Sequence, residues 1–187
     1  SLSSARSNSV LSLFEDKDGL IWVGTWGDGV NTYDKKTKKI SGIIESGAIT
    51  CIAQGDSDLV WIGVYGSGKG LFAYNKSAGT RMNYTKANGL SSNDIYCIYQ
   101  DKNRMVWIGT AGGGLNMLDY KTGKVQLYQH EKTKNSISDN TVNCIYDDRK
   151  GHLWIGTSNG LNQFDIKGQT FTQYNEKDGL PNGNIWG

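Results

Sequence analysis

The residues best suited to acid–base chemistry in this chain are two histidines and a recurring aspartate. His130 and His152 are the only histidines, and neither has a nucleophile or carboxylate partner at a recognisable spacing. A surface-loop position is favoured for both. Asp16, Asp101 and Asp148 could supply paired carboxylates for glycoside cleavage. They stand at one repeated turn position, however, whereas an active site needs unlike environments for its two carboxylates. We therefore predict turn hydrogen bonding for the aspartates, no catalytic residue, and no enzymatic activity for this fragment.

The three cysteines could act as nucleophiles, disulfide partners or metal ligands. Cys51, Cys97 and Cys144 each lie ten residues before a tryptophan of a repeated string, and Ser12 takes the same place in the first copy. Three equivalent positions cannot pair evenly into disulfides. No CxxC motif or histidine cluster accompanies them, so metal binding is not expected. We predict free thiols that serve as small buried hydrophobic side chains, with no metal site and no cofactor.

These residues all belong to a repeat that sets the fold. The string recurs four times, as DKDGLIWVGT, GDSDLVWIGV, DKNRMVWIGT and DRKGHLWIGT, with tryptophans at Trp22, Trp61, Trp107 and Trp154. The tryptophans are 39, 46 and 47 residues apart. Each unit also holds alternating β-forming residues and glycine turns that outline four short strands. This pattern predicts an all-β fold, a β-propeller of four four-stranded antiparallel blades.

The repeat places the blades along nearly the whole chain. We assign residues 1–9 to a lead-in, 10–48, 49–94, 95–141 and 142–184 to four blades, and 185–187 to the start of a fifth, within one propeller domain. The fifth start is visible when residues 89–96 are overlaid on residues 179–186. We therefore expect an excerpt of a larger propeller, with about seven blades. Open blade faces would also invite pairing with a second copy, so a homodimer is a further hypothesis.

Eight repeated positions have a structural interpretation. The four tryptophans are expected in the blade core, where each buries a large apolar surface. A glycine follows each tryptophan by two residues, at Gly24, Gly63, Gly109 and Gly156. We predict that these glycines permit close packing between neighbouring blades.

Two aromatic residues break the repeat and are the candidate ligand-binding residues. Trp26 and Tyr65 follow the tryptophan strand in the first two units, where the later units have Ala111 and Ser158. Non-repeating aromatic side chains could stack on sugar rings, whose faces are apolar. Simple loop packing is the alternative interpretation.

Charge and hydropathy exclude some partners. A formal net charge of +2 over 187 residues gives no electrostatic footprint for nucleic acid or an anionic membrane. No apolar run approaches the length of a membrane span, so we expect no direct membrane insertion of this fragment.

The repeat unit, V-x-x-I-x-x-D-x-x-G-x-L-W-I-G-T-x-x-G-G-L-x-x-[YF]-D, resembles the two-component regulator propeller repeat. The fit is closest in residues 95–128 and 142–174. The second unit departs most, with Gly55 for the aspartate, Val64 for the threonine and Phe72 for the asparagine. In the third unit Arg104 replaces the turn glycine.

The resemblance implies a place outside the cytoplasmic membrane, in the periplasmic sensor domain of a hybrid two-component regulator. Such a domain responds to oligosaccharides and packs against other blades or domains of the parent sensor, which passes the signal to a histidine kinase. We interpret the chain as a ligand-sensing extracytoplasmic domain. One alternative is a scaffold for protein–protein interaction or dimerisation without a small-molecule ligand. A second is a propeller lyase or hydrolase.

Overall fold

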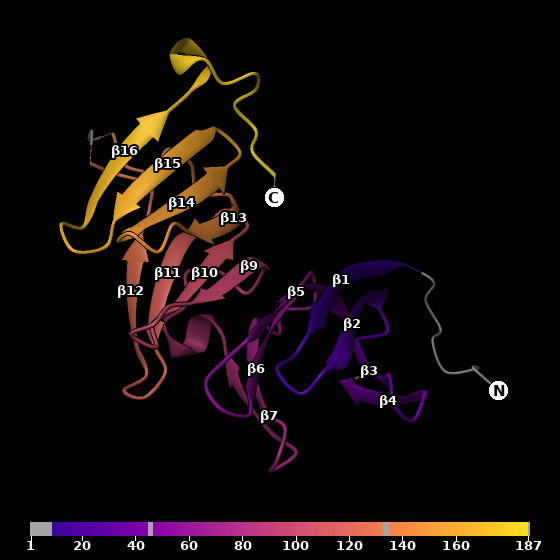
Figure 1. Cartoon of the computed structure of the whole chain (residues 1–187). Helices are drawn as coiled ribbons and strands as arrows, with labels where there is room; N and C mark the ends of the chain where they lie inside the picture. The colour runs from indigo at the N-terminus through magenta and orange to yellow at the C-terminus, as the bar shows by residue number, and fades with distance from the viewer. Residues whose placement is uncertain (1–8, 45–46, 133–134, 187) are drawn as a thin grey trace. The chain divides into compact units, whose positions relative to one another are not determined.

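The computed structural model describes residues 9–44, 47–132 and 135–186, and in these ranges the chain is built from β-strands and two short 3-10 turns (Figure 1). The prediction of an all-β fold is confirmed. Residues 1–8 of the expected lead-in and Gly187 of the expected fifth-blade start lie outside the described residues. The blade boundaries stay predictions. Two compact units are distinguished, residues 1–85 with 93–95 and residues 86–92 with 96–187, and each is described by itself.

The first unit holds one continuous eight-stranded sheet. Its strands are β1 (Val10–Glu15), β2 (Leu20–Gly27), β3 (Val30–Asp34), β4 (Lys39–Ile44), β5 (Gly47–Gln54), β6 (Leu59–Tyr65), β7 (Leu71–Asn75) and β8 (Thr80–Tyr84). They are ordered β4-β3-β2-β5-β6-β7-β8, with β1 paired to β2. The link between its two four-stranded halves is the antiparallel pairing of β2 with β5. Through this pairing the start of β5, at Gly47 and Ala48, lies against the end of β2, at Trp26 and Gly27.

The second unit holds two separate four-stranded antiparallel sheets. The first contains β9 (Ile95–Gln100, whose first residue belongs to the first unit), β10 (Val106–Thr110), β11 (Gly114–Asp119) and β12 (Lys124–Tyr128). The second contains β13 (Val142–Asp147), β14 (His152–Thr157), β15 (Gly160–Asp165) and β16 (Thr170–Tyr174). The 3-10 turns are η1 (Lys86–Asn88) and η2 (Glu176–Asp178). In the described part of the chain no helix is long and apolar enough to cross a membrane.

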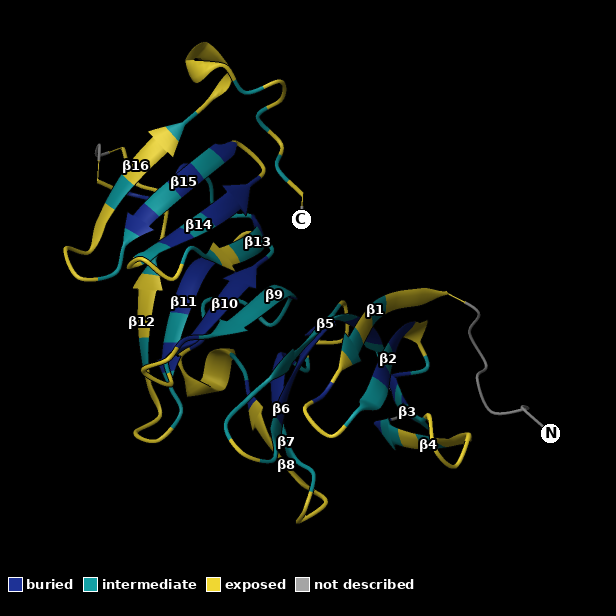
Figure 2. Ribbon diagram, viewed as in Figure 1, coloured by how far each residue is buried: buried dark blue, intermediate teal, exposed yellow. Residues whose placement is uncertain are grey.

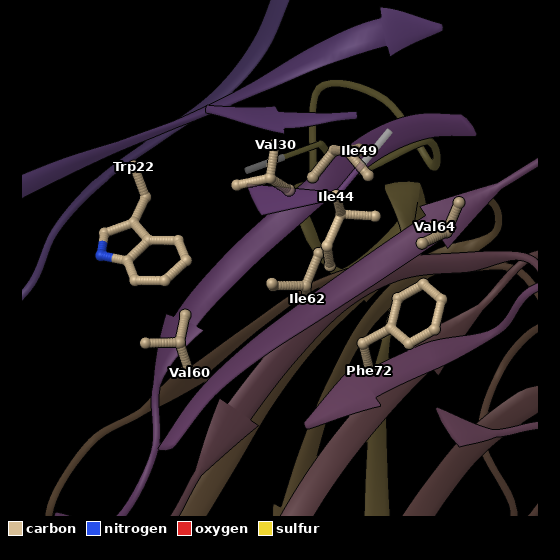
Figure 3. Close-up of a cluster of buried hydrophobic side chains, with 8 residues drawn as sticks. All are labelled: Trp22, Val30, Ile44, Ile49, Val60, Ile62, Val64 and Phe72. Carbon is tan, nitrogen blue, oxygen red and sulfur yellow. The ribbon is translucent and has the colours of Figure 1, made fainter. Parts of the chain in front are cut away.

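The inner strands carry the buried side chains (Figure 2). In the first unit, Figure 3 shows the cluster formed by Trp22, Val30, Ile44, Ile49, Val60, Ile62, Val64 and Phe72. The second unit has a matching cluster of Trp107, Leu115, Ile137, Val142, Leu153, Ile155 and Phe164. Of the four repeated tryptophans, Trp22, Trp61 and Trp107 are fully buried. Trp154 is only half-buried and stacks on Tyr174.

In the first and third repeats the recurring aspartate accepts a hydrogen bond from the tryptophan six residues later. Trp22 Nε1 donates to Asp16 Oδ2 over 2.9 Å, and Trp107 Nε1 donates to Asp101 Oδ2 over 3.0 Å. The other oxygen of each carboxylate accepts two backbone N–H groups of the same turn. In the second sequence repeat Gly55 replaces this aspartate, and a Cβ there would lie 2.8 Å from Trp61 Nε1. Asp16 and Asp101, of the first and third sequence repeats, therefore act through turn hydrogen bonds.

The glycine two residues after each tryptophan marks a close approach between consecutive four-stranded segments. A Cβ at Gly24, Gly63, Gly109 or Gly156 would lie 2.6–2.8 Å from a methyl carbon of Ile49, Ile95, Val142 or Ile185, respectively. The backbone carbonyl of the same β-branched residue accepts a hydrogen bond from the preceding segment's first strand. The donors are Ser12 Oγ to Ile49 (2.9 Å), Thr50 Oγ1 to Ile95 (2.6 Å), Cys97 Sγ to Val142 (3.8 Å) and Asn143 Nδ2 to Ile185 (3.0 Å). We call this recurring arrangement the segment junction.

One ion pair ties the two halves of the first unit together. Lys76 Nζ, in the turn after β7, lies 2.8 Å from Asp16 Oδ2 and 2.5 Å from Asp18 Oδ2. The Asp16 side chain is 0% exposed and that of Lys76 14%. Burial alone would raise the pKa of Asp16, but hydrogen bonds from Lys76, Trp22 and backbone N–H groups outweigh it and lower that pKa below 3.8. Burial alone would lower the pKa of Lys76, and its two aspartate partners raise that pKa above 10.5.

Substitution of a junction glycine should destabilise the fold by steric overlap. We expect Gly109→Ala to lower the free energy of unfolding by about 2–3 kcal/mol, because its Cβ would lie 2.3 Å from Cys97 Sγ and 2.9 Å from the Val142 carbonyl oxygen. Gly42→Ala is the matched control, since a Cβ there meets only Asn31 Oδ1 at 3.7 Å. Urea unfolding followed by fluorescence measures both. Equal stability of the two variants would contradict the assignment.

Loss of the Lys76 cation should leave Asp16 buried without its charge partner. We expect Lys76→Met to cost about 2–4 kcal/mol near neutral pH. The exposed pair of Lys35 and Glu15 provides the control, because Lys35→Met should change stability by no more than about 0.5 kcal/mol.

The cost of Lys76→Met should also depend on pH. The lowered Asp16 pKa makes the pair's contribution fully present above 3.8 and lost as the pH falls through the folded-state value. The raised Lys76 pKa makes it fully present below 10.5 and lost as the pH rises through the folded-state value. The difference between wild type and variant should therefore be level between these limits and shrink beyond both. A difference that does not change with pH would refute this electrostatic account.

Candidate functional site

Trp26 and Tyr65, the two predicted ligand-binding residues, lie in one row across three neighbouring strands. Trp26 of β2 pairs directly with Ala48 of β5, and Ala48 pairs directly with Tyr65 of β6. Directly paired residues of antiparallel strands project from the same face of a sheet. Two strand spacings therefore separate the backbones that carry the two aromatic side chains, roughly 9–10 Å. We call Trp26, Ala48 and Tyr65 the aromatic row.

The row presents an unusual amount of apolar surface. Trp26 is 57% exposed, Tyr65 is half-buried, and the small Ala48 between them is only 7% exposed. The Trp26 backbone is held in place by its strand pairing and by its N–H, which donates to Ser9 O over 2.9 Å. The row is thus a strand surface with an exposed indole on one side of the buried Ala48 and the half-buried Tyr65 on the other.

Glycines leave space beside both aromatic residues. Gly27 and Gly66 directly follow Trp26 and Tyr65, and both have a positive φ, of 105° and 72°. A Cβ at either glycine would meet nothing within 4 Å. Gly27 ends β2 and Gly66 directly follows β6, and at both positions the positive φ favours glycine. A flat ligand could therefore reach the backbone beside each ring.

Two carboxylates flank the row. At the Trp26 end, Asp28 forms a backbone bridge with Gly47, the residue before Ala48. At the Tyr65 end, Asp94 Oδ1 accepts a hydrogen bond from Gly66 N over 2.8 Å. The row thus combines apolar faces with hydrogen-bond acceptors, which is the composition of a site for a ring with polar substituents.

Ala48 is the member of the row that sequence reasoning missed. Ala48 directly precedes Ile49, the β-branched residue of the segment junction. The later repeats have Asp94, Thr141 and Asn184 at this position. A small apolar residue at an otherwise polar position was the available signal. Its meaning depends on the pairing of β2 with β5, which the repeat did not predict.

The remaining acid–base residues are engaged in local structure. Asp148 Oδ1 accepts two backbone N–H groups of its turn, and Asp148 Oδ2 lies 2.9 Å from His152 Nδ1. Burial alone would raise the pKa of Asp148, and these hydrogen bonds lower it. His152 is the first residue of β14, so the surface-loop prediction is wrong for it. His130 Nδ1 lies 2.9 Å from the Ile137 carbonyl oxygen, to which it can donate.

The cysteines lie against the junction glycines. Their sulfur atoms would be 2.3–2.5 Å from a Cβ at Gly63, Gly109 or Gly156. All three are free cysteines of intermediate burial, so the prediction of free thiols is confirmed and that of full burial is not. Burial raises the pKa of the Cys51 thiol to about 12 and also raises that of Cys144. Among the described residues no group of three or more His, Cys, Asp or Glu side chains could hold a metal ion.

Comparison with known families identifies the fold. The model of the N-terminal β-propeller domain of PorZ, a TSS9 protein, matches residues 64–179. The chain belongs to this PorZ propeller family. The model of the two-component regulator propeller matches residues 4–27, so the resemblance drawn from the repeat is confirmed. The predicted β-propeller fold is confirmed as well.

Solved structures agree with this PorZ-type propeller. The extracellular domain of a putative hybrid two-component system from B. thetaiotaomicron is 28% identical, with a TM-score of 0.83 over 96% of this chain and 25% of its own. That of another such system from the same organism is 22% identical, with a TM-score of 0.54 over 90% of this chain and 28% of its own. PorZ of Porphyromonas gingivalis, a surface component of the type-IX secretion system, is 19% identical, with a TM-score of 0.70 over 94% and 28%. The two comparisons below 25% identity show the fold alone.

The chain spans about a quarter of the length of these structures. No curated protein sequence matches it significantly.

The buried thiols should be chemically silent in the folded protein. Since the thiolate is the reactive form, the raised pKa of Cys51 should slow its alkylation at pH 8 by at least about a hundredfold relative to the urea-unfolded chain, and the raised pKa of Cys144 should slow alkylation there as well. Iodoacetamide labelling read by peptide mass spectrometry measures each site. Rapid labelling of either cysteine without unfolding would contradict the assignment.

Proposed function

We propose that this chain is a ligand-sensing extracytoplasmic domain of a two-component signalling protein, and that it binds an oligosaccharide at the aromatic row. The exposed Trp26, fixed on a rigid strand in register with Tyr65, is the observation that carries the proposal. The extracellular sensor-type domain that is 28% identical over nearly the whole chain supports the signalling context. The ligand class rests on the chemistry of the row.

The exposed indole of Trp26 offers a flat apolar face to a ligand. A sugar ring offers a flat apolar face for stacking and hydroxyl groups around its edge for hydrogen bonding. The row matches both properties, because its aromatic faces stand beside the acceptors Asp28 and Asp94. Two aromatic positions separated by two strand spacings can contact two non-adjacent rings of one chain, which favours an oligosaccharide over a single sugar.

The signalling context is carried by the longer protein. The neighbouring structures are about four times as long as this chain, so a histidine kinase in the same protein and a periplasmic location belong to the proposal. We assign the fragment itself no catalysis and no cofactor. Its proposed partners are the oligosaccharide and the other blades or domains of the parent sensor.

A protein-interaction scaffold is the second candidate, and the family match favours it. PorZ is a bacterial surface component of a secretion system, and its propeller model covers more than half of the present chain. Exposed apolar side chains at Leu13, Met82 and Tyr146 offer protein-binding surface. Dimerisation is one form of this hypothesis. A lyase or hydrolase has no observation in its favour, because the recurring aspartates are used in turns.

Removal of either aromatic side chain of the row should weaken oligosaccharide binding. We expect Trp26→Ala and Tyr65→Ala each to raise the Kd at least tenfold, about 1.4 kcal/mol, because each substitution removes a stacking face. Isothermal titration calorimetry of the full ectodomain against a panel of neutral, amino and acidic oligosaccharides measures the effect.

Tyr146→Ala is the matched control, since this equally exposed aromatic residue lies outside the row and should leave the Kd unchanged. Binding that survives both row substitutions would move the ligand site elsewhere. An ectodomain that binds no member of the panel would reject the oligosaccharide and leave the scaffold as the working function.

A further inference from the structure

A carboxylate oxygen without a hydrogen-bond partner lies at the Trp26 end of the aromatic row. Asp28 Oδ2 is buried and has no partner in the part of the chain that the structure describes. Two other buried side-chain atoms share this condition, Tyr128 Oη and Asn143 Oδ1. Tyr128 carries a phenol and Asn143 an amide, so Asp28 is the carboxyl group among the three.

An unpaired buried carboxylate oxygen needs an explanation. Buried polar atoms in folded proteins are nearly always paired, and an exception calls for a cause such as an absent ligand. An ionised carboxylate can only accept hydrogen bonds, so a group that satisfies it must carry N–H or O–H donors. The unpaired oxygen therefore specifies the chemistry of its missing partner.

The position of Asp28 connects it to the row. Its bridge to Gly47 places its backbone beside Ala48, the centre of the row. Gly27, between Trp26 and Asp28, leaves open space where a side chain would stand. Asp28 as a residue is half-buried, and Oδ2 is the covered atom of its carboxyl group. A ring stacked on Trp26 would have this carboxylate at its edge.

We infer that Asp28 sets the ligand specificity of the aromatic row by accepting a hydrogen bond from an ammonium or hydroxyl group of the bound sugar. The inference rests on the proposed function. A second carboxylate, Asp94, stands at the other end of the row on Gly66, and Lys69 is the cation of the turn that follows Tyr65. The row therefore selects amino and neutral sugars and discriminates against uronic acids, whose carboxylates would be repelled by Asp28.

The first test needs no ligand. Asp28→Asn keeps the shape of the side chain and removes its charge. Because Asp28 Oδ2 has no hydrogen-bond partner among the described residues, the substitution breaks no hydrogen bond of that oxygen, and the Tm should stay the same or rise. Asp16→Asn is the contrasting control, because it weakens the ion pair with Lys76 and should lower the Tm. A Tm that falls as far for Asp28→Asn as for Asp16→Asn would overturn the inference.

The second test uses three ligands with one backbone. Chitosan, cello- and cellouronate hexasaccharides share the β-1,4-linked gluco backbone and carry ammonium, hydroxyl or carboxylate groups. Calorimetry at pH 6 with the full ectodomain should rank the affinities in that order, with at least a tenfold difference between the first and the last. Asp28→Asn should reduce this ratio to less than threefold, while Trp26→Ala should weaken all three hexasaccharides.

The outcomes separate the two proposals. Binding that is equal for the three hexasaccharides, or strongest for cellouronate, overturns the role of Asp28 and leaves oligosaccharide sensing in place. A ratio that Asp28→Asn does not change has the same meaning. Absence of binding for all three, together with none in the wider panel, rejects the proposed function and this inference with it.

Discussion

The close approach at the segment junction is the contact on which the rest of the fold depends. At each junction a β-branched side chain lies over a glycine backbone, and its own carbonyl accepts a hydrogen bond from the strand it has approached. The two contacts need each other. Without the glycine, the strand could not come close enough for the hydrogen bond. Without the hydrogen bond, the carbonyl would be covered with its hydrogen-bonding capacity unused.

The junction explains why its donor can vary while its glycine does not. Serine, threonine, cysteine and asparagine all donate to the carbonyl, over distances of 2.6–3.8 Å. Each of these side chains is short and carries a polar or weakly polar hydrogen, so each can reach the same acceptor from neighbouring positions of the strand. The glycine has no such substitute, because any Cβ would lie within 2.8 Å of a carbon atom that cannot move freely. Cysteine at this position is therefore a packing choice, consistent with the absence of any partner for disulfide formation.

Much of this architecture could be predicted from the sequence, because a repeat states each local rule several times. The tryptophan spacing was enough for the all-β class, and the glycine positions indicated the close packing between segments. The contacts that the sequence did not predict each occur at a single place in the chain and are not repeated from one sequence repeat to the next. The pairing of β2 with β5 depends on the length of one connection, and the bridge from Lys76 to Asp16 joins two turns 60 residues apart. In the fourth sequence repeat, the carboxylate of Asp148 contacts His152, whereas the equivalent aspartates of the first and third repeats bond a tryptophan. The sequence did not predict this difference. Such contacts depend on three-dimensional proximity, which a local pattern does not contain.

The candidate site arises where the repeat is broken, and this follows from the physics of the junction. Positions that every sequence repeat needs for packing are occupied by similar residue types. Their side chains already contact the neighbouring segment, so they are not available to bind a ligand. The aromatic row uses positions at strand ends, where the later units have small or polar residues. Of the strands β5, β9 and β13, which each begin a later repeat, only β5 pairs with a strand of the repeat before it. That extra pairing turns two separate aromatic side chains into one surface and brings Asp28 beside it through Gly47. The same pairing of β2 with β5 that joins the two halves of the sheet therefore also assembles the row, so the site and the departure from regular repetition have one structural cause.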